Sequence, residues 1–359
     1  MRHRRNTTAW IALATISGSA CRASSPSSDL EFECFVENDA RVLGGPTDRY
    51  YTNAVRLAIT GDRSVEGQGS GAPLTWLDAL MIPSAARASA RADSSVERRW
   101  AWFLGHHLYT PSDIHTRNPP SDDRPYAGWL YSGIESRWVA LGNECGEHDR
   151  AAMVSVSLGL VGPDALGESV QNGFHDLIDV PHAEGWSHQL HDEPTLQITS
   201  RYQERVARST CDGFTGDVIC DGAWAAGNVF ANVSLGSTAR FGYGLQRDFA
   251  THQIDPSAKL LAEFEEPRSP SDRLDWGAHV FIGAEGRAVA HNMLLSGNNF
   301  RSSAGVDAEL FVGDLRAGVS VRVGPAELVY MQTIRSEEFE AQDGSQRFWS
   351  VHVTWRFSE

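Results

Sequence analysis

The stretch Trp349-Ser350-Val351-His352-Val353-Thr354-Trp355-Arg356-Phe357 decides the fold class of this 359-residue chain. Apolar and polar side chains alternate through it without a break. This period of two predicts a β-strand with one apolar face, because successive side chains of a strand point to opposite sides. A strand of this kind that ends in an aromatic residue fits a soluble sandwich or the last strand of a bacterial outer-membrane barrel.

Runs with the same alternation recur along the chain and predict an all-β protein. We expect about a dozen strands, which lies within the range of outer-membrane barrels. Glycines are frequent inside these runs, and barrels use glycines to bend their strands. The predicted strands span residues 30–37, 50–60, 100–109, 129–141, 152–161, 196–206, 229–242, 276–291, 306–312, 317–323, 326–332 and 348–357.

The N-terminus has the pattern of a secretory signal peptide. Three arginines precede the short apolar run 9–16, and the small residues 17–20 offer a cleavage site. Cys21 follows directly, which leaves a lipoprotein anchor as an alternative. No later stretch of about 18 apolar residues predicts a membrane-spanning helix. We therefore expect a signal peptide at 1–20 and a single β-barrel domain at 21–359.

Charge and cysteine usage narrow the function classes. The formal net charge of -15 argues against nucleic-acid binding, which needs basic clusters. The cysteines lack zinc-site spacing with histidines. Cys211 and Cys220 bracket a Gly/Asp-rich stretch and could form a disulfide in an oxidising compartment. We expect a monomer.

One stretch, Gly162–His175, predicts a helix. It opens with Gly-Pro-Asp, a favourable helix start. We expect the apolar face to pack against the barrel rim, and His175 to be a general base on the polar face. A solvated surface helix is the alternative. The polar face carries Asp164, Glu168, Gln171 and His175, and the apolar face carries Leu166, Val170, Phe174 and Leu177.

The order of the strands gathers the polar motifs at one end of the barrel. If both termini face the periplasm, the odd strands end, and the even strands begin, at the outer rim. This places Glu37-Asn38-Asp39, residues 50–53, 109–113 and 122–128, and the predicted helix on that rim. Residues 61–97 would form an extended periplasmic insertion. Such a rim is what an enzyme acting on the outer leaflet needs.

These motifs, with Gly185-Trp186 and Glu193-Pro194 beyond them, resemble the outer-membrane lipid A 3'-O-deacylases of the LpxR type. The resemblance covers most of the chain and is strongest from 37 to 194. It implies a twelve-stranded antiparallel outer-membrane β-barrel with a short helix in an extracellular loop. It also implies a Ca²⁺-dependent hydrolase that removes the 3'-linked acyloxyacyl chain from lipid A of lipopolysaccharide in the outer leaflet of the bacterial outer membrane.

The resemblance also implies roles for single residues. His175 would be the base that activates water, with Gln171 one turn before it. Two family positions differ: Thr116 stands where a basic residue is expected, and Val180-Pro181 where a carboxylate is expected. The remaining expected site residues are Asn38 and Asp39 as calcium ligands, Thr52 lining the site, and Arg117 and Arg124 meeting a lipid A phosphate.

Plainer interpretations stand beside these. Asn38-Asp39 can be a turn, Arg124 can simply pair with Asp123, and residues 126–129 can form an aromatic girdle. An outer-membrane phospholipase with a Ser169–His175 dyad is one alternative function, although a step of six residues puts the two on different helix faces. A porin or binding barrel without chemistry is another. His106, His107, His188 and His191 are expected on the surface.

Overall fold

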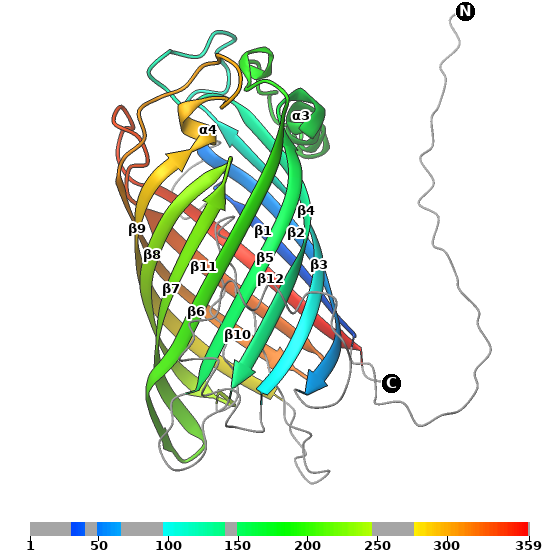
Figure 1. Cartoon of the computed structure of the whole chain (residues 1–359), viewed down its shortest axis with the longest axis vertical. Coiled ribbons are helices and arrows are strands. Elements are labelled where there is room, and N and C mark those ends of the chain that lie inside the picture. The colour runs from blue at the N-terminus through cyan, green and yellow to red at the C-terminus, as the bar shows by residue number, and fades with distance from the viewer. Residues whose placement is uncertain (1–29, 40–48, 66–95, 141–148, 246–275, 358–359) are drawn as a thin grey trace, which may run out of the picture.

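The chain folds as a closed barrel of twelve antiparallel strands (Figure 1). The computed structural model describes residues 30–39, 49–65, 96–140, 149–245 and 276–357. Each strand pairs with its neighbours in sequence, and β1 closes the ring by pairing with β12. The predicted all-β barrel is therefore confirmed. The strands are β1 (Leu30–Asn38), β2 (Tyr50–Val65), β3 (Val96–Thr110), β4 (Ala127–Ala140), β5 (Arg150–Val161), β6 (Glu193–Cys211), β7 (Phe214–Gly227), β8 (Phe230–Tyr243), β9 (Trp276–Asn292), β10 (Phe311–Val323), β11 (Ala326–Arg335) and β12 (Gln346–Phe357).

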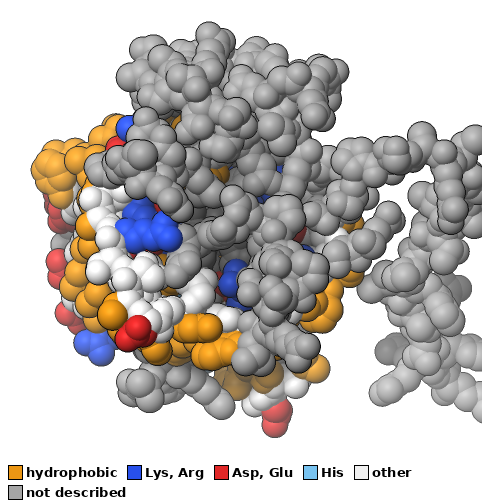
Figure 2. Space-filling view, turned by 90° about the horizontal axis from the view of Figure 1, so that it is seen from below, with side chains coloured by type: hydrophobic (Ala, Val, Ile, Leu, Met, Phe, Trp, Pro, Cys, Tyr) orange, Lys and Arg blue, Asp and Glu red, His pale blue; other side chains and the backbone are white. Residues whose placement is uncertain are grey.

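The wall separates apolar from polar side chains. In β12, Val353 and Trp355 are exposed on the outside, while the alternate residues His352 and Thr354 are buried inside. Seen from below, hydrophobic side chains follow the outer edge of the barrel and basic side chains lie inside it (Figure 2). An apolar outer band is the surface that a bilayer requires.

Ion pairs fill much of the lumen. Arg137 Nη1 lies 2.5 Å from Glu33 Oε1, and the same guanidinium contacts Glu135. Arg56 Nη2 approaches Glu135 from the neighbouring side at 2.8 Å. Similar groups join Arg240 to Asp217 and arginines of β9 to β11 to acidic partners. The lumen is thus packed with paired charges in the part of the barrel that the structure describes.

The expected number of strands, about a dozen, agrees with the structure. However, two of the predicted strands are one strand, and another strand was missed. Two strands were expected at 306–312 and 317–323. The structure has one strand there, β10, which takes the end of the first segment and all of the second. Strand β7 was missed because Gly216, Asp217 and Asp221 give it the composition of a loop. Both aspartates face the lumen and pair with arginines, which explains their presence in a strand.

The structure does not form the disulfide that the sequence left open. Cys211 and Cys220 are free thiols. Cys211 pairs with Phe214 at the β6–β7 turn, whereas Cys220 pairs with Glu204 six positions further along the ladder. The two cysteines are therefore separated by about 20 Å along the hairpin, far beyond disulfide reach.

Several expectations lie largely outside the described residues. Strand β2 extends to Val65 and strand β3 begins at Val96, so both ends of the insertion expected at 61–97 belong to these strands. The rest of that insertion, the signal peptide and Cys21 are among the residues not described. Across the described ranges, no helix has the length and apolar character needed to cross a membrane.

Candidate functional site

Helix α3 (Gly167–Ile178) lies against the outside of the barrel wall, at the rim that also carries the short helix α4 (Met293–Ser296) (Figure 1). A Cβ atom at Gly128 of β4 would come within 3.1 Å of the Gly167 backbone, so glycine at this position lets the helix lie close to the wall. His106, on the outer face of β3, donates from Nε2 to the carbonyl of Ala165 at 2.8 Å. The predicted helix is confirmed, and it covers the outer faces of β3 and β4.

The helix has the opposite orientation to the one expected. Gln171 and His175 are each 4% exposed and face the wall. The apolar side chains Val170, Phe174 and Leu177 point away from the protein and are exposed. The prediction that the apolar face packs on the rim is therefore wrong. The expectation assumed water around the rim, but outward side chains of the strands beneath α3, such as Trp102 and Leu104, are apolar and exposed as well.

The ring of His175 is held in one orientation. Its Nδ1 donates to the carbonyl of Pro181 at 2.6 Å, because a carbonyl can only accept. In the neutral ring, Nε2 is then the basic nitrogen. The chain returns to His175 through Asp179, whose φ of 57° reverses its direction at the end of α3. Pro181, a residue where the resemblance led us to expect a carboxylate, thus contacts the ring through its backbone carbonyl, while Asp176 pairs with His182.

Gln171 presents an amide donor to the same space. Its Oε1 accepts a hydrogen bond from Trp186 Nε1 at 2.8 Å, which fixes the amide orientation. Its Nε2 is buried and has no hydrogen-bond partner among the described residues. A buried donor without a partner points to a ligand group or water, because such groups are rarely left unsatisfied. Asn172, the next residue, holds the following loop through Ala183.

Asn38, Asp39 and Thr52 meet where β1 ends and β2 begins. Asp39 N donates to the Thr52 carbonyl at 3.3 Å, and a bulge around Thr52 interrupts the ladder there. The Thr52 hydroxyl lies 2.6 Å from that of Thr110, the last residue of β3. Asp39 is fully buried, and its Oδ2 accepts from Arg49 N at 2.7 Å. Through Thr110, this strand end is linked to β3, one of the two strands that α3 covers.

The side chains at this strand end offer oxygen donors of the type that a hard cation binds. Asp39 offers a carboxylate, Asn38 an amide oxygen, and Thr52 a hydroxyl and a carbonyl. Oxygen ligands of this mixture are those that Ca²⁺ takes. Within the described ranges, no group of three or more His, Cys, Asp or Glu side chains could hold a metal. Any calcium here would thus depend on amide, hydroxyl and backbone oxygens besides Asp39.

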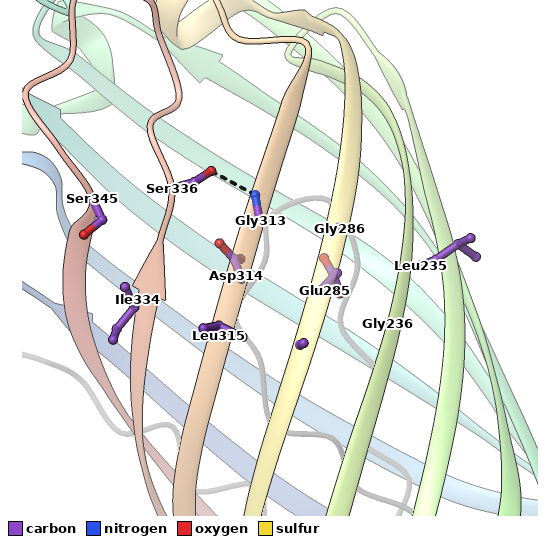
Figure 3. Close-up of a pocket in the computed structure, with 11 residues that line it drawn as sticks. Leu235, Gly236, Glu285, Gly286, Gly313, Asp314, Leu315, Ile334, Ser336 and Ser345 are labelled. Atoms are coloured by element: carbon purple, nitrogen blue, oxygen red, sulfur yellow. Dashed lines mark hydrogen bonds between the residues drawn. The ribbon is translucent and has the colours of Figure 1, made fainter.

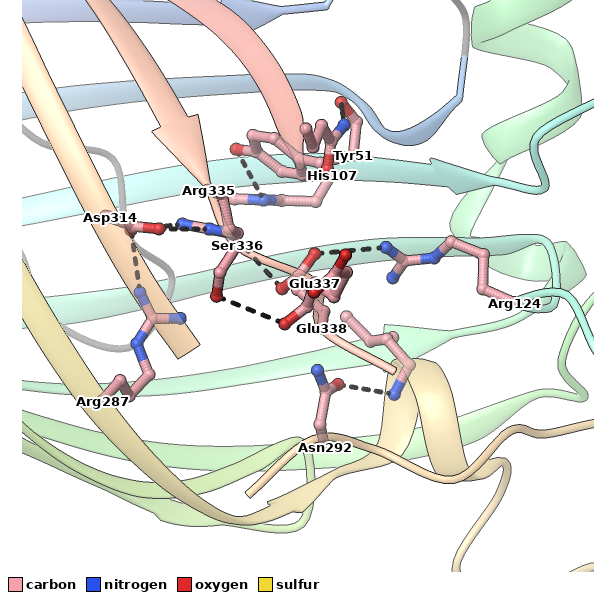
Figure 4. Close-up of polar contacts among 12 residues, drawn as sticks. Tyr51, His107, Arg124, Arg287, Asn292, Asp314, Arg335, Ser336, Glu337 and Glu338 are labelled. Carbon is pink, nitrogen blue, oxygen red and sulfur yellow. Dashed lines mark hydrogen bonds and ion pairs between the residues drawn. The ribbon is translucent and has the colours of Figure 1, made fainter. Parts of the chain in front are cut away.

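The two arginines expected to meet a phosphate differ in their surroundings. The Arg117 side chain is 81% exposed and its Nε lies 2.7 Å from Glu184, a carboxylate that raises the pKa of Arg117. Arg124 is buried and faces Glu338 at 3.6 Å, above the Tyr109 ring (Figure 4). Burial lowers the pKa of Arg124. Its Nε and Nη1 have no hydrogen-bond partner among the described residues, and the expected phosphate contact stays a prediction.

Thr116 and the neighbouring residues serve the loop itself. Its hydroxyl donates to Asp113 Oδ2 at 2.8 Å, and Asp113 Oδ1 accepts from His115 N. These bonds lower the pKa of Asp113. Thr116 thus stabilises the turn in place of the basic side chain expected there.

His107 was expected on the surface but is buried. His107 faces the lumen, where its Nε2 lies 2.9 Å from the Tyr131 hydroxyl, close to Tyr51. The alternation in β3 already puts His107 on the face of Tyr109, so the sequence held this signal.

Tyr126 is buried against Trp186, and Trp129 donates to Thr195 inside the barrel, so the expected aromatic girdle is absent at these two positions.

A hollow of about 650 Å³ lies in strands β8 to β11, on the opposite side of the ring from α3 (Figure 3). Gly236, Gly286 and Gly313 line it, together with Leu315. Its two acidic residues are already paired with arginines. None of the predicted site residues lines it, so we do not assign the chemistry to this hollow.

Comparison with known families decides what the barrel is. The family model described as outer membrane protein LpxR matches residues 9–357. The chain belongs to the LpxR family. Among solved structures, LpxR from Salmonella typhimurium is similar with a TM-score of 0.67 at 18% identity, covering 91% of this chain and 100% of its own. The predicted family and outer-membrane location are confirmed.

Other solved barrels are more distant from this LpxR family member. The β-domain of the Bordetella autotransporter BrkA has a TM-score of 0.40 at 10% identity, covering 93% of this chain and 99% of its own. The translocator domain of the autotransporter NalP from Neisseria meningitidis has 0.39 at 6% identity, covering 93% and 90%. No curated protein matches the chain.

Proposed function

We propose that this chain is a Ca²⁺-dependent lipid A 3'-O-deacylase, which hydrolyses the ester of the 3'-linked acyloxyacyl chain. The observation that carries the proposal is the pair His175 and Gln171, buried together against the outer wall. One offers a basic nitrogen and the other an unpaired amide donor. Family membership and outer-membrane location support the choice of a lipid A ester as substrate.

The chemistry follows from these two side chains. Nε2 of His175 takes a proton from a water molecule as its oxygen attacks the ester carbonyl carbon. The tetrahedral intermediate collapses by breaking the bond to the sugar oxygen, and the imidazolium returns the proton to that leaving oxygen. The products are the free acid and the 3' hydroxyl. The Pro181 carbonyl holds the ring throughout, since its bond to Nδ1 is present in both charge states.

The other residues assist this step. Gln171 Nε2 would donate to the oxygen on which negative charge develops. A calcium ion held by Asn38 and Asp39 would polarise the ester carbonyl. Thr52 would orient the attacking water through its hydroxyl. Arg117, at the exposed edge of the site, would meet a lipid A phosphate by exchanging Glu184 for it.

Mass spectrometry of lipid A from cells that make the protein tests the proposal. Loss of the 3' acyloxyacyl mass is expected with the native chain, and not with His175→Ala. His182→Ala is the matched control, because His182 is an exposed histidine on the same loop. Chelation of calcium during an in vitro reaction should stop the native protein. An unchanged lipid A mass with the folded native protein would refute the function.

The two alternative functions are less well supported. Ser169 is exposed whereas His175 is buried, so they occupy different faces of α3 and do not form a dyad. A porin needs an open lumen, but inside this one Arg137 and Arg201 are paired with carboxylates of non-adjacent strands.

A further inference from the structure

We propose that α3 is inserted by its apolar stripe into the acyl-chain region of the outer leaflet. The stripe consists of Leu166, Val170, Phe174, Leu177 and Ile178, whose side chains are between 45% and 79% exposed. Large apolar side chains recur on this face at the spacing of helical turns, and no described segment covers them. A single exposed leucine is ordinary, but a contiguous helical stripe marks an interaction surface.

The barrel wall identifies the partner. Outward side chains of β3 and β4, the strands beneath α3, are also apolar and exposed, including Trp102, Leu104 and Ile134. On the adjoining strands β5 and β6, Leu158 and Leu196 continue this band. The stripe on α3 is an extension of the lipid-facing wall toward the rim. The occupant we infer is therefore the acyl chains of the outer leaflet.

The polar residues of α3 agree with a helix lying in the interface plane. Glu168 and Asp176 are exposed and lie off the stripe. Asp176 is engaged by His182 on the following loop, which keeps that side of the helix polar. A helix with one charged face and one apolar face is the form that settles at the boundary of headgroups and chains.

Insertion would set the depth of the candidate site. Gln171 follows Val170 directly, and His175 follows Phe174, so the buried polar row runs beside the inserted apolar row. An ester of a membrane lipid lies at the same boundary. This consequence rests on the proposed function, whereas the insertion itself rests only on the exposed stripe and the outer-membrane location.

Depth-dependent quenching tests the insertion without any measure of activity. In a chain whose five native cysteines are replaced by alanine, an environment-sensitive fluorophore is attached at Phe174→Cys or Leu177→Cys. Matched controls carry it at Glu168→Cys or Asp176→Cys on the same helix. The labelled protein is reconstituted in phosphatidylcholine vesicles that contain a lipid with a nitroxide near its carbonyl group.

We expect the nitroxide lipid to quench the two stripe labels several-fold more strongly than the controls, and iodide in the water to quench the controls more strongly. Equal iodide quenching at all four positions would place the stripe in water and overturn the proposal. Stripe labels shielded from both quenchers would show that protein covers them, which would also overturn it. Because no turnover is measured, either result is independent of whether the chain is a deacylase.

Discussion

The oxygen and the nitrogen of the Gln171 amide have different surroundings. The oxygen holds Trp186, and the nitrogen donor is left for a ligand. Replacing Gln171 by Glu keeps an acceptor for Trp186 but removes the donor and adds negative charge. We expect kcat for lipid A hydrolysis to fall by about 10²–10³, the usual cost of losing an oxyanion donor. Steady-state kinetics on purified protein would show the loss in kcat rather than in KM.

The control for this change is Glu168→Gln, an opposite exchange at an exposed position one turn earlier on α3. It should leave kcat unchanged. If Gln171→Glu also kept its full kcat, the amide donor would have no part in the reaction.

At this scale the sequence singles out side chains but does not predict their partners. The spacing of the polar stripe brought out Gln171 and His175. The acceptor for His175 is a backbone carbonyl, Pro181, and a carbonyl leaves no mark in the sequence. The burial of Arg124 could not be predicted, because it faces Glu338, a residue far along the chain that the closed barrel brings to it.

The contact between α3 and β4 depends on two facing glycines. Gly128→Ala would put a Cβ atom 3.1 Å from the Gly167 Cα and nitrogen, and backbone cannot yield as a flexible side chain does. We expect α3 to shift outward by a few tenths of an ångström and deacylase activity to fall by roughly several-fold, since a misplacement of about 1 Å can cost 10²-fold. The barrel itself should keep its native mobility on gels of unheated samples.

Gly173→Ala is the matched control on α3, because a Cβ atom there meets nothing within 4 Å. Alanine also favours the helix by up to about 1 kcal/mol relative to glycine. This variant should therefore keep full activity. Full activity of Gly128→Ala as well would mean that the site tolerates a displaced helix.

The sequence predicted α3 but assigned the wrong face of the helix to the contact with the protein. An amphipathic pattern shows that the two faces of a helix have different surroundings, but not which of them is the protein. In a water-soluble protein, Phe174 and Leu177 would face the core. Outside a barrel the surroundings are apolar, and the polar face is the one that packs on the protein.

The ion pairs of the lumen hold the barrel as a whole. Arg137 is buried between Glu33 and Glu135, on strands that are far apart in sequence. Replacing Arg137 by Met leaves two buried carboxylates without this cation. We expect a loss of about 3–5 kcal/mol in the free energy of unfolding, as for other broken buried pairs. Urea unfolding from lipid vesicles, followed by tryptophan fluorescence, would measure it.

Arg150→Met provides the comparison, because Arg150 pairs with Glu204 at 3.5 Å with both side chains about 30% exposed. Its loss should cost no more than about 1 kcal/mol. Similar costs for the two variants would show that the lumen is well hydrated and that its pairs contribute little.

The barrel as a whole was predictable because its pattern is repeated in nearly every strand. Alternation needs only a lipid-facing side and a lumen side, and both follow from the sequence. The exception, β7, shows the limit: Asp217 and Asp221 look like loop residues until their partners Arg240 and Arg201 are placed beside them on the neighbouring strands β8 and β6. Their pairing is a property of the sheet register and not of the segment alone.

The position of α3 on the outer surface of the wall has a kinetic consequence. A substrate reaches such a site by lateral diffusion within the leaflet, in two dimensions, and does not pass through the barrel. The quantity that governs encounter is then the surface density of the lipid around the protein rather than its concentration in bulk solution. Diluting the lipid substrate with inert lipid slows such an enzyme, whereas diluting the whole membrane suspension leaves the turnover of each protein molecule unchanged.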